Sequence, residues 1–428
     1  KVLYVTKAKV GTDYVVSTNT DIYQYDIESK TTTNLTEGMM GYDTHPSFNK
    51  DGVLAWLSMK EDGNEADKND LYILLDGNKI NLTASWDNTV FSYIWSNDGK
   101  KIYFTAATQG TQQLFEIEPF AKNPTPKQLT KGVFDISDIL GQSGDLLVVS
   151  RNDMNRAAEI YTVNLKERKA PLEVKQLSHI NDDLYKHIAK CPVKERTIKT
   201  TDGKDMLAWV IYPPDFSPKK KYPTLLYCEG GPQSALTQFY SFRWNLQLMA
   251  SQGYIVIAPN RRGMPGHGVA WNAEISGDWG GQVMKDYLAA IDDIAKEPYV
   301  DTSRLGAVGA SYGGYSVYYL AGIHNKRFKT FIAHCGVFNT KSMYGTTEEI
   351  FFNRHEFGGD YWDKGNAIAQ KAVTEFNPIE KVEAWDTPIL IIHGGKDYRV
   401  PEEQGFQAFT AAQLRGIKSK LLYFPDEN

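Results

Sequence analysis

The sequence has no hydrophobic run long enough to cross a bilayer, because none approaches the roughly 18 apolar residues that a membrane helix needs. It also has no large excess of one charge: the formal net charge is -5, and the Lys and Arg residues are scattered along the chain. Proteins that bind nucleic acid usually carry clustered basic residues. We therefore predict a soluble protein with neither a membrane partner nor a nucleic-acid partner.

Cysteine is scarce as well. The three cysteines, Cys191, Cys228 and Cys335, lie far apart without the spacing of a metal site. We interpret them as buried free thiols, which do not indicate a compartment, and we predict no metal and no cofactor. The first residues, from Lys1 to Tyr4, contain neither an initiator Met nor the regions of a signal peptide. Any targeting signal is therefore expected before this start.

Length and residue pattern together predict two domains. A chain of 428 residues exceeds what one hydrophobic core usually organises. Residues 1–190 contain short alternating segments between polar turns, which is typical of β-strands. From about residue 196 onward, apolar segments alternate with amphipathic ones, which is typical of an α/β domain. We place the linker at residues 185–200.

The first half repeats itself. A tripeptide such as Asp-Ile-Tyr recurs at 21–23, 70–72, 113–115 and 159–161, and each copy is followed by Leu-Thr or Leu-Ser, at 35–36, 82–83, 129–130 and 177–178. An Asp-Gly pair, at 51–52 and again at 98–99, predicts a tight hairpin. A period in the forties is typical of propeller blades. We assign residues 1–190 to about four blades of a β-propeller, either a small closed ring or part of a larger one.

The second half, residues 191–428, is predicted to form a mostly parallel, doubly wound sheet of the α/β-hydrolase class. Strands are expected at residues 208–212, 223–228, 254–258, 305–309, 330–334, 388–392 and 420–424, and helices at 282–296, 314–323 and 402–415.

A G-x-S-x-G motif, residues 309–313, stands where an apolar strand meets a helix. Its glycines permit a sharp turn that exposes the hydroxyl of Ser311, and the N–H of Tyr312 is placed to face a developing oxyanion. The alternative is a tight turn around an ordinary serine. We predict Ser311 as a catalytic nucleophile.

A nucleophilic serine needs a base and an acid that orients the base. Asp397 follows the strand at 388–392, at the edge where such sheets place their sites, and we predict it as the acid; the alternative is a turn former. The loop after the strand at 223–228 contains Gly230 and Gly231. We predict the N–H of Gly231, with Gly230 as fallback, as the second oxyanion donor, and a simple turn is the alternative.

No His follows Asp397, although hydrolases of this class order their triads Ser, Asp, His. His393 is interpreted as a structural residue, and His267, His324, His334 and His355 all precede the acid. The last predicted strand ends just before Asn428, so we expect the base beyond that residue.

These motifs, together with Gly-Gly-Pro at 230–232, Arg-Arg-Gly at 261–263, Gly-Asp-Trp-Gly at 277–280 and the segment from His393 to Pro401, resemble the prolyl oligopeptidase family. The resemblance covers the whole second half and is strongest to the dipeptidyl-peptidase and acylaminoacyl-peptidase branch. It implies a propeller, commonly of seven or eight blades, that caps the hydrolase, so N-terminal blades and the triad His are both expected outside the sequence.

The resemblance also implies substrate-binding residues. Arg399 matches an Arg that binds the substrate backbone, with a surface Arg as the alternative. An apolar wall around the first subsite would be formed by Val337, Phe338, Met343, Tyr344 and Val400, which are otherwise core residues. Because dipeptide release requires a carboxylate for the free amino group, we predict Glu65, with Asp67 second, in an acidic loop that is otherwise merely solvated.

We therefore predict a serine exopeptidase that releases N-terminal dipeptides from oligopeptides. The alternatives are an acylaminoacyl peptidase, an esterase or an oligopeptidase of the same family, or an inactive hydrolase whose propeller acts as an interaction scaffold. Family analogy implies a periplasmic or secreted location. The oligomeric state stays open, with a homodimer as one option.

Overall fold

A computed structural model describes residues 1–167 and 169–428. These residues form two compact units, the first containing Lys1–Ile188 and the second most of the remaining chain. Two short segments that we assigned to the hydrolase half, Thr237–Phe242 and Pro265–Val269, pack with the first unit.

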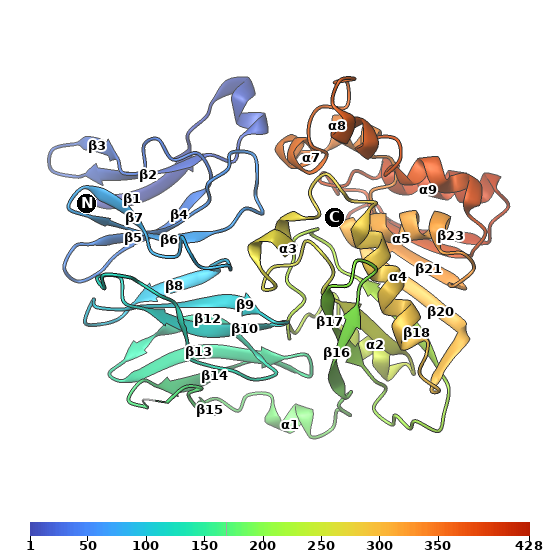
Figure 1. Ribbon diagram of the computed structural model, residues 1–428, viewed down its shortest axis with the longest axis horizontal. Helices are drawn as coiled ribbons and strands as arrows, with labels where there is room; N and C mark the ends of the chain where they lie inside the picture. Colours follow the sequence, from blue (N-terminus) through green and yellow to red (C-terminus); the bar gives the residue numbers. More distant parts are fainter. Residues whose placement is uncertain (168) are drawn as a thin grey trace. The chain divides into compact units, whose positions relative to one another are not determined.

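In its described residues, the first unit contains four antiparallel sheets that follow one another along the chain (Figure 1). They are β1 (Val2–Lys7) to β3 (Thr31–Asn34), with β2 (Thr20–Asp26) between them; β4 (Asp43–Phe48), β5 (Leu54–Ser58), β6 (Asp70–Leu75) and β7 (Asn78–Asn81); β8 (Ser92–Trp95), β9 (Ile102–Thr108), β10 (Thr111–Ile117) and β11 (Lys127–Gln128); and β12 (Asp135–Ser143), β13 (Leu146–Asp153), β14 (Arg156–Asn164) and β15 (Val174–Gln176). Two short helices, η1 (Gly11–Val16) and α1 (Asp182–Tyr185), complete the unit.

Each sheet shares a hydrophobic cluster with the next one. Ile22 of the first sheet packs with Trp56 of the second, Leu71 of the second with Phe104 of the third, and residues of the third sheet with the fourth in the same way. A series of antiparallel sheets that bury their faces against their neighbours is the arrangement of propeller blades.

The repeated residues close each blade through one side chain. In the second blade, the hydroxyl of Thr83 accepts a hydrogen bond from the N–H of Leu71 (3.0 Å) and donates one to Asp70 (2.6 Å). The same pair of bonds is made by Thr36 with Ile22 and Asp21, by Thr130 with Leu114 and Gln113, and by Ser178 with Ile160 and Glu159. The repeat therefore encodes a hydroxyl that fastens the end of each blade to its neighbouring strand; we call it the blade latch.

The Asp-Gly turns differ from a tight two-residue hairpin. The connection between β4 and β5 comprises residues 49–53, and Gly52 has a φ of 82°. The side-chain oxygen of Asn49 accepts hydrogen bonds from the N–H groups of Asp51 (3.0 Å) and Val53 (2.8 Å). The glycine supplies the left-handed backbone as predicted, but an Asn side chain organises the longer turn.

The second unit is built on an eight-stranded sheet of order β16-β17-β19-β18-β20-β21-β22-β23. Its strands are β16 (Val193–Lys199), β17 (Asp205–Ile211), β18 (Tyr222–Cys228), β19 (Ile255–Pro259), β20 (Val300–Ala310), β21 (Thr330–His334), β22 (Ile389–Gly394) and β23 (Ser419–Phe424). β17 pairs antiparallel with β16 and β19, and all other pairs are parallel. This is an α/β-hydrolase sheet.

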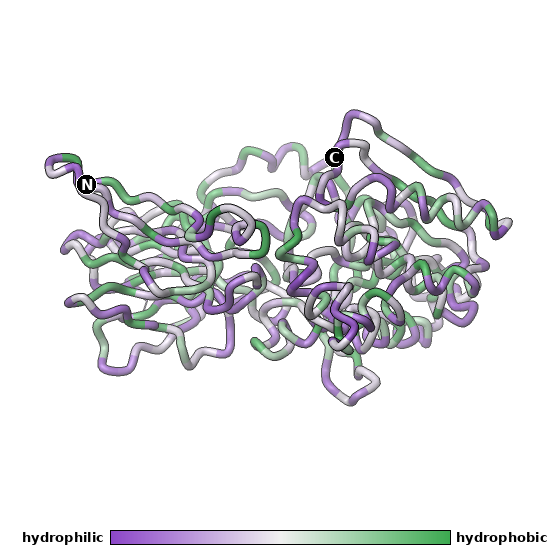
Figure 2. Tube along the Cα trace, turned by 90° about the horizontal axis from the view of Figure 1, so that it is seen from above, coloured by the Kyte–Doolittle hydropathy of each residue, from purple (hydrophilic) through white to green (hydrophobic). Residues whose placement is uncertain are grey.

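Helices pack against the parallel part of this sheet. The longest are α4 (Gln282–Ile294), α5 (Tyr312–Ile323) and α9 (Glu403–Leu414), of which α5 packs against β18, β20 and β21, and α9 against β22 and β23. The others are α2 (Leu246–Ser251), α3 (Val269–Ala273), α6 (Thr340–Thr346), α7 (Ile350–Glu356), α8 (Ala367–Ala372) and η2 (Pro378–Ala384). Hydrophilic residues lie mostly in the outer loops of each unit (Figure 2). Among the described residues, no helix is long and apolar enough to span a membrane.

Candidate active site

Ser311 lies between β20 and α5 in a strained conformation. Its φ is 59°, in the left-handed region that a residue with a side chain rarely adopts, and its N–H donates a hydrogen bond to the carbonyl of His334 (3.0 Å). A Cβ on Gly313 would lie 2.0 Å from the carbonyl oxygen of Cys228, and one on Gly309 would lie 2.6 Å from the same atom. The glycines therefore let the turn pack against β18, as the nucleophile turn of a hydrolase requires.

Tyr312 is the first residue of α5, so its N–H has no acceptor within the helix. Its buried side chain is fixed by a hydrogen bond from its hydroxyl to the carbonyl of Trp279 (2.9 Å). A helix N-terminus with a fixed, available N–H is suited to bind an oxyanion.

The loop after β18 approaches this turn. A Cβ on Gly230 would lie 3.1 Å from the carbonyl of Ala310 and 3.5 Å from Cβ of Ser311, and Gly231 has a φ of 113°. A side chain would crowd Ala310 at the first position and strain the backbone at the second, so both positions favour glycine.

Asp397 lies in the loop that follows β22. Its Oδ1 accepts hydrogen bonds from the N–H groups of Arg399 (3.1 Å) and Val400 (2.9 Å), which orient the carboxylate. Among the described residues, no group donates a hydrogen bond to Oδ2 of Asp397. That oxygen can therefore accept a hydrogen bond from another group. Because β18, β20 and β22 are parallel members of one sheet, their carboxyl ends bring the Gly-Gly loop, Ser311 and Asp397 to the same edge.

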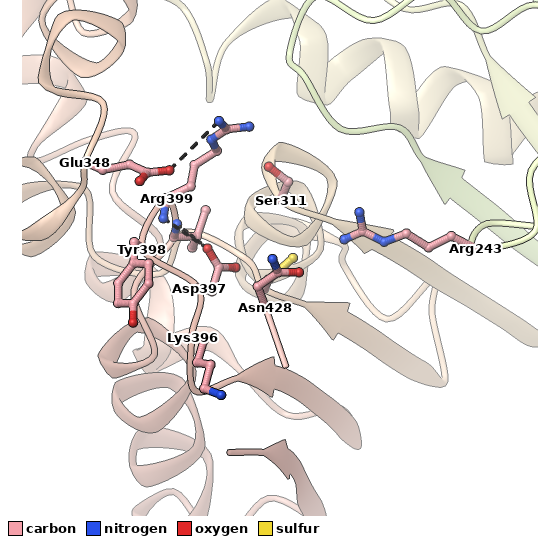
Figure 3. A pocket seen from close by; sticks show the side chains of 10 residues that line it. Arg243, Ser311, Glu348, Lys396, Asp397, Tyr398, Arg399 and Asn428 are labelled. Carbon is pink, nitrogen blue, oxygen red and sulfur yellow. Dashed lines mark hydrogen bonds and ion pairs between the residues drawn. The ribbon is translucent and has the colours of Figure 1, made fainter. Parts of the chain in front are cut away.

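Ser311 and Asp397 line one pocket of about 510 Å³ (Figure 3). Its lining residues are Arg243, Ser311, Cys335, Glu348, Lys396, Asp397, Tyr398, Arg399, Val400 and Asn428. Arg243, which sequence reasoning missed, extends toward the pocket from the side opposite Arg399 (Figure 3). The pocket therefore presents three cationic side chains and two carboxylates, a polar surface suited to a peptide backbone.

Arg399 is held at the pocket by two glutamates. Its Nη2 lies 2.6 Å from an oxygen of Glu349 and 4.0 Å from one of Glu348. The hydroxyl of Thr347 donates to the Arg399 carbonyl (2.7 Å), which ties the two loops together. Nothing in the sequence pattern indicated Glu349, because it follows the predicted pocket wall in an ordinary acidic pair.

None of the histidines of the chain lines this pocket in the described structure. His393 is fully buried and its Nε2 contacts the carbonyl of Val400 (2.7 Å), which agrees with a structural role. Burial lowers the pKa of His324 and of His267 to about 4, and His267 lies in the first unit. His334 offers its backbone carbonyl to the N–H of Ser311, while His355 lies beside Glu356.

The five residues predicted to form the apolar wall lie in two different places. Val400 lines the pocket together with Ser311. Val337, Phe338, Met343 and Tyr344 are at most 4% exposed and belong to the main hydrophobic core of the second unit. These four residues pack in the core, and the hydroxyl of Tyr344 also donates a hydrogen bond to Asp360. Their part in an apolar wall stays a prediction.

The two acidic residues predicted for the substrate amino group lie in the first unit. Asp67 accepts hydrogen bonds from the N–H groups of Lys60 and Glu61 (both 2.8 Å), so its carboxylate organises its own loop. Glu65 lies near Lys7. Burial lowers the pKa of Lys7, and the negative charges of Asp62 and Glu65 partly oppose that effect.

The three cysteines are buried free thiols, as the sequence predicts. Burial raises the pKa of the Cys335 thiol, which lines the pocket, to about 11, so it stays protonated at neutral pH. Within the described part of the chain, no group of three or more His, Cys, Asp or Glu side chains is arranged to hold a metal ion.

Known proteins are similar to this chain in sequence. The chain is 47% identical over 430 residues to dipeptidyl-peptidase 5 of Porphyromonas gingivalis, an alignment that covers 100% of the chain and 62% of that protein. It is 31% identical to dipeptidyl-peptidase 5 of Schizosaccharomyces pombe, with 96% of the chain and 59% of that protein covered. The chain thus spans about three fifths of the curated relatives it matches.

Solved structures share the fold. The acylaminoacyl peptidase of Pyrococcus horikoshii aligns with a TM-score of 0.80 at 21% identity, over 95% of this chain and 62% of that one. Dipeptidyl peptidase 4 of Porphyromonas gingivalis aligns with a TM-score of 0.72 at 20% identity, over 97% and 57%. The sequence model of the prolyl oligopeptidase family matches residues 240–428, which include Ser311 and Asp397. These residues of the chain therefore match the prolyl oligopeptidase family.

Proposed function

We propose that the whole protein is a serine exopeptidase that releases dipeptides from the amino end of oligopeptides. The observation that carries this proposal is the left-handed Ser311 at the first turn of α5, in one pocket with Asp397. The relatives that cover the chain are named dipeptidyl-peptidase 5, which favours dipeptide release over other reactions of the family.

In the proposed reaction, Ser311 Oγ attacks the carbonyl carbon of the second residue while the proton of its hydroxyl passes to a base. The carbonyl electrons move onto oxygen, where the N–H groups of Tyr312 and Gly231 stabilise the negative charge. Collapse breaks the C–N bond, and the proton passes to the leaving amine. Water then attacks the acyl-enzyme while the base takes one of its protons. The bond between the acyl carbon and Ser311 Oγ breaks, Oγ regains a proton from the base, and the dipeptide is released.

The base is the remaining part of the proposal. Family order places a His after the acid, and we expect it beyond Asn428. Asp397 is the proposed partner for that His. Two backbone N–H groups hold its carboxylate through Oδ1, so Oδ2 can accept the hydrogen bond from the imidazole.

Replacing Ser311 in the full-length protein tests the reaction. We expect Ser311→Ala to abolish hydrolysis of a dipeptidyl-nitroanilide and labelling by a fluorophosphonate probe, with thermal unfolding unchanged. Ser303→Ala is the matched control, because Ser303 lies on β20, the strand that leads to Ser311, and its hydrogen bonds among the described residues go to Asp301. Full turnover by Ser311→Ala contradicts the proposal, and a wild-type protein that neither turns over nor is labelled supports the scaffold alternative.

Substrate class is tested by blocking the amino group. A dipeptidyl-peptidase hydrolyses the free-amino substrate and discriminates against its N-acetylated form, whereas an acylaminoacyl peptidase shows the reverse preference. Glu65 and Asp67 stay our proposed anchors for the amino group, and Glu65→Gln is expected to raise KM for the free-amino substrate alone. A periplasmic or secreted location is proposed by family analogy, and cell fractionation tests it.

A further inference from the structure

Arg261 is fully buried, and all five of its side-chain N–H groups have acceptors. Nε donates to the hydroxyl of Tyr287 (2.9 Å), and Nη1 to the carbonyls of Pro232 (2.6 Å) and Arg262 (2.8 Å). Nη2 donates to the carbonyls of Glu229 (3.1 Å) and Gly230 (3.5 Å). Three of the five acceptors thus belong to the loop that holds the predicted oxyanion donor Gly231.

The bonds to Glu229 and Gly230 fix the direction of two peptide groups. In a trans peptide the C=O and the following N–H point in opposite directions. Because Arg261 draws the carbonyls of residues 229 and 230 toward itself, the N–H groups of Gly230 and Gly231 are directed away from it. The same loop lies close to Ser311, because a Cβ added to Gly230 would lie 3.5 Å from Cβ of Ser311.

Arg261 also contacts the other predicted oxyanion donor. Its guanidinium carbon lies 4.9 Å from the centre of the Tyr312 ring, within cation–π range. Arg261 therefore bonds to the backbone of the Gly-Gly loop and contacts the side chain of Tyr312, the residue that carries the other predicted donor. Gly263, the third residue of the Arg-Arg-Gly motif, has a φ of 95°, and a Cβ there would lie 2.7 Å from Cγ2 of Ile275 and 2.9 Å from Nη1 of Arg261.

The surroundings of Arg261 differ from those of an ordinary buried ion pair. In the described structure no carboxylate lies within ion-pair distance of Arg261, whereas its neighbour Arg262 pairs with Asp202, Glu274 and Asp286. A buried cation that is bonded mainly to backbone carbonyls of one loop is arranged to hold that loop in place.

We propose that Arg261 is a positioning residue that sets both backbone donors of the oxyanion hole, an inference that rests on the function proposed above. A Lys cannot replace it, because an ammonium has three donors on one atom and cannot reach five acceptors spread around a planar fork. The expected defect is therefore in the transition state more than in substrate binding.

The test compares Arg261→Lys and Tyr287→Phe with Arg262→Lys in the full-length protein. Arg262→Lys is the matched control, because Arg262 is adjacent and equally buried but bonds to carboxylates outside the loop. For each variant, kcat and KM are measured with a dipeptidyl-nitroanilide, and binding is measured for a dipeptide aldehyde and for the dipeptide product. Ser311 Oγ adds to the aldehyde carbon, and the former carbonyl oxygen of the hemiacetal occupies the oxyanion site.

We expect Arg261→Lys to lower kcat by about 100-fold, which is close to the effect of removing one oxyanion donor. The affinity for the dipeptide aldehyde should fall by a similar factor. KM and product binding should change by less than about threefold. Tyr287→Phe, which removes one acceptor of Arg261, should lower kcat by about fivefold, and Arg262→Lys should lower the melting temperature without changing kcat.

A folded Arg261→Lys variant with wild-type kcat overturns the proposal, as does an equal loss of aldehyde and product binding. If Arg261→Lys does not fold, Tyr287→Phe decides, and an unchanged kcat in that variant overturns the proposal. A wild-type protein that does not hydrolyse the dipeptidyl substrate contradicts instead the proposed function.

Discussion

Nη2 of Arg399 lies 2.6 Å from Oε1 of Glu349, at the pocket that contains Ser311. The Glu349 side chain is 17% exposed and that of Arg399 is 61% exposed. Glu349 is thus the more buried partner, and it restrains a cation whose side chain lies mostly in solvent.

Replacing Glu349 with Gln should loosen Arg399 without touching Ser311. Because Arg399 is well solvated, the pair is worth no more than about 1 kcal/mol, so we expect KM for a peptide to rise about two- to fivefold with kcat unchanged. Burial raises the pKa of Glu349, so the wild-type KM should also rise as the pH falls and Glu349 becomes protonated. Steady-state kinetics across pH check this, and the pH effect should be absent in the variant.

Gly313→Ala should disrupt the nucleophile turn. Its new Cβ would lie 2.0 Å from the carbonyl oxygen of Cys228, which belongs to a central strand and cannot move freely. We expect a loss of more than tenfold in kcat/KM and of about 1–3 kcal/mol in stability, the usual cost of overpacking. Kinetics and urea unfolding measure both.

The matched control for that substitution is Gly345→Ala. Gly345 lies in α6, and a Cβ there would meet nothing within 4 Å. It should keep wild-type activity and gain up to about 1 kcal/mol, because Ala favours helix more than Gly does. Equal activity of the two variants would contradict a packing role for Gly313.

Thr83→Val should open one blade latch. The substitution keeps the shape of a side chain that is 1% exposed but leaves the N–H of Leu71 and the carboxylate of Asp70 without its hydroxyl. The expected cost is about 1–3 kcal/mol, seen as faster hydrogen exchange in β6 and β7. Thr33→Val, on an exposed part of β3, should change stability by less than about 0.5 kcal/mol.

The ionisation of Asp135 should lower the free energy of unfolding of the first unit as the pH rises. Burial raises its pKa to about 6, although Thr237, Gln112 and Gln238 donate hydrogen bonds to it. A folded-state pKa above the unfolded one means that its stabilising effect is present below about pH 4 and is lost as the pH rises through 6.

The shift corresponds to about 3 kcal/mol at neutral pH. Asp135→Asn should therefore flatten the pH dependence of urea unfolding between pH 4 and pH 7, by an amount of that order. A variant with the same slope as the wild-type protein would show that Asp135 does not titrate in this range.

The parallel strands and the nucleophile turn could be predicted because their signals are local. Residues 330–334 were expected as a strand and form β21, and the glycines around Ser311 define a turn that few other sequences adopt. β16 was missed because it is an edge strand in which only Ile198 is buried, so charged residues hide its pattern.

Features that depend on distant residues could not be predicted. Thr237 packs with the first unit because its hydroxyl bonds to Asp135, more than a hundred residues earlier, and no pattern around Thr237 indicates this partner. The Arg-Arg-Gly motif was visible in the sequence, but four of the five acceptors of Arg261 lie about thirty residues before it or in α4 after it. Local patterns locate such residues, and only the fold shows what they hold.

The φ of 59° at Ser311 places the nucleophile in conflict with the stability of its own domain. A left-handed backbone costs a residue with a side chain about 1–3 kcal/mol and costs glycine almost nothing. A Ser311→Gly substitution would thus give a more stable protein that lacks the nucleophile. Serine is kept at this position only under selection for its chemistry, and the strained φ is a loss of stability that accompanies reactivity.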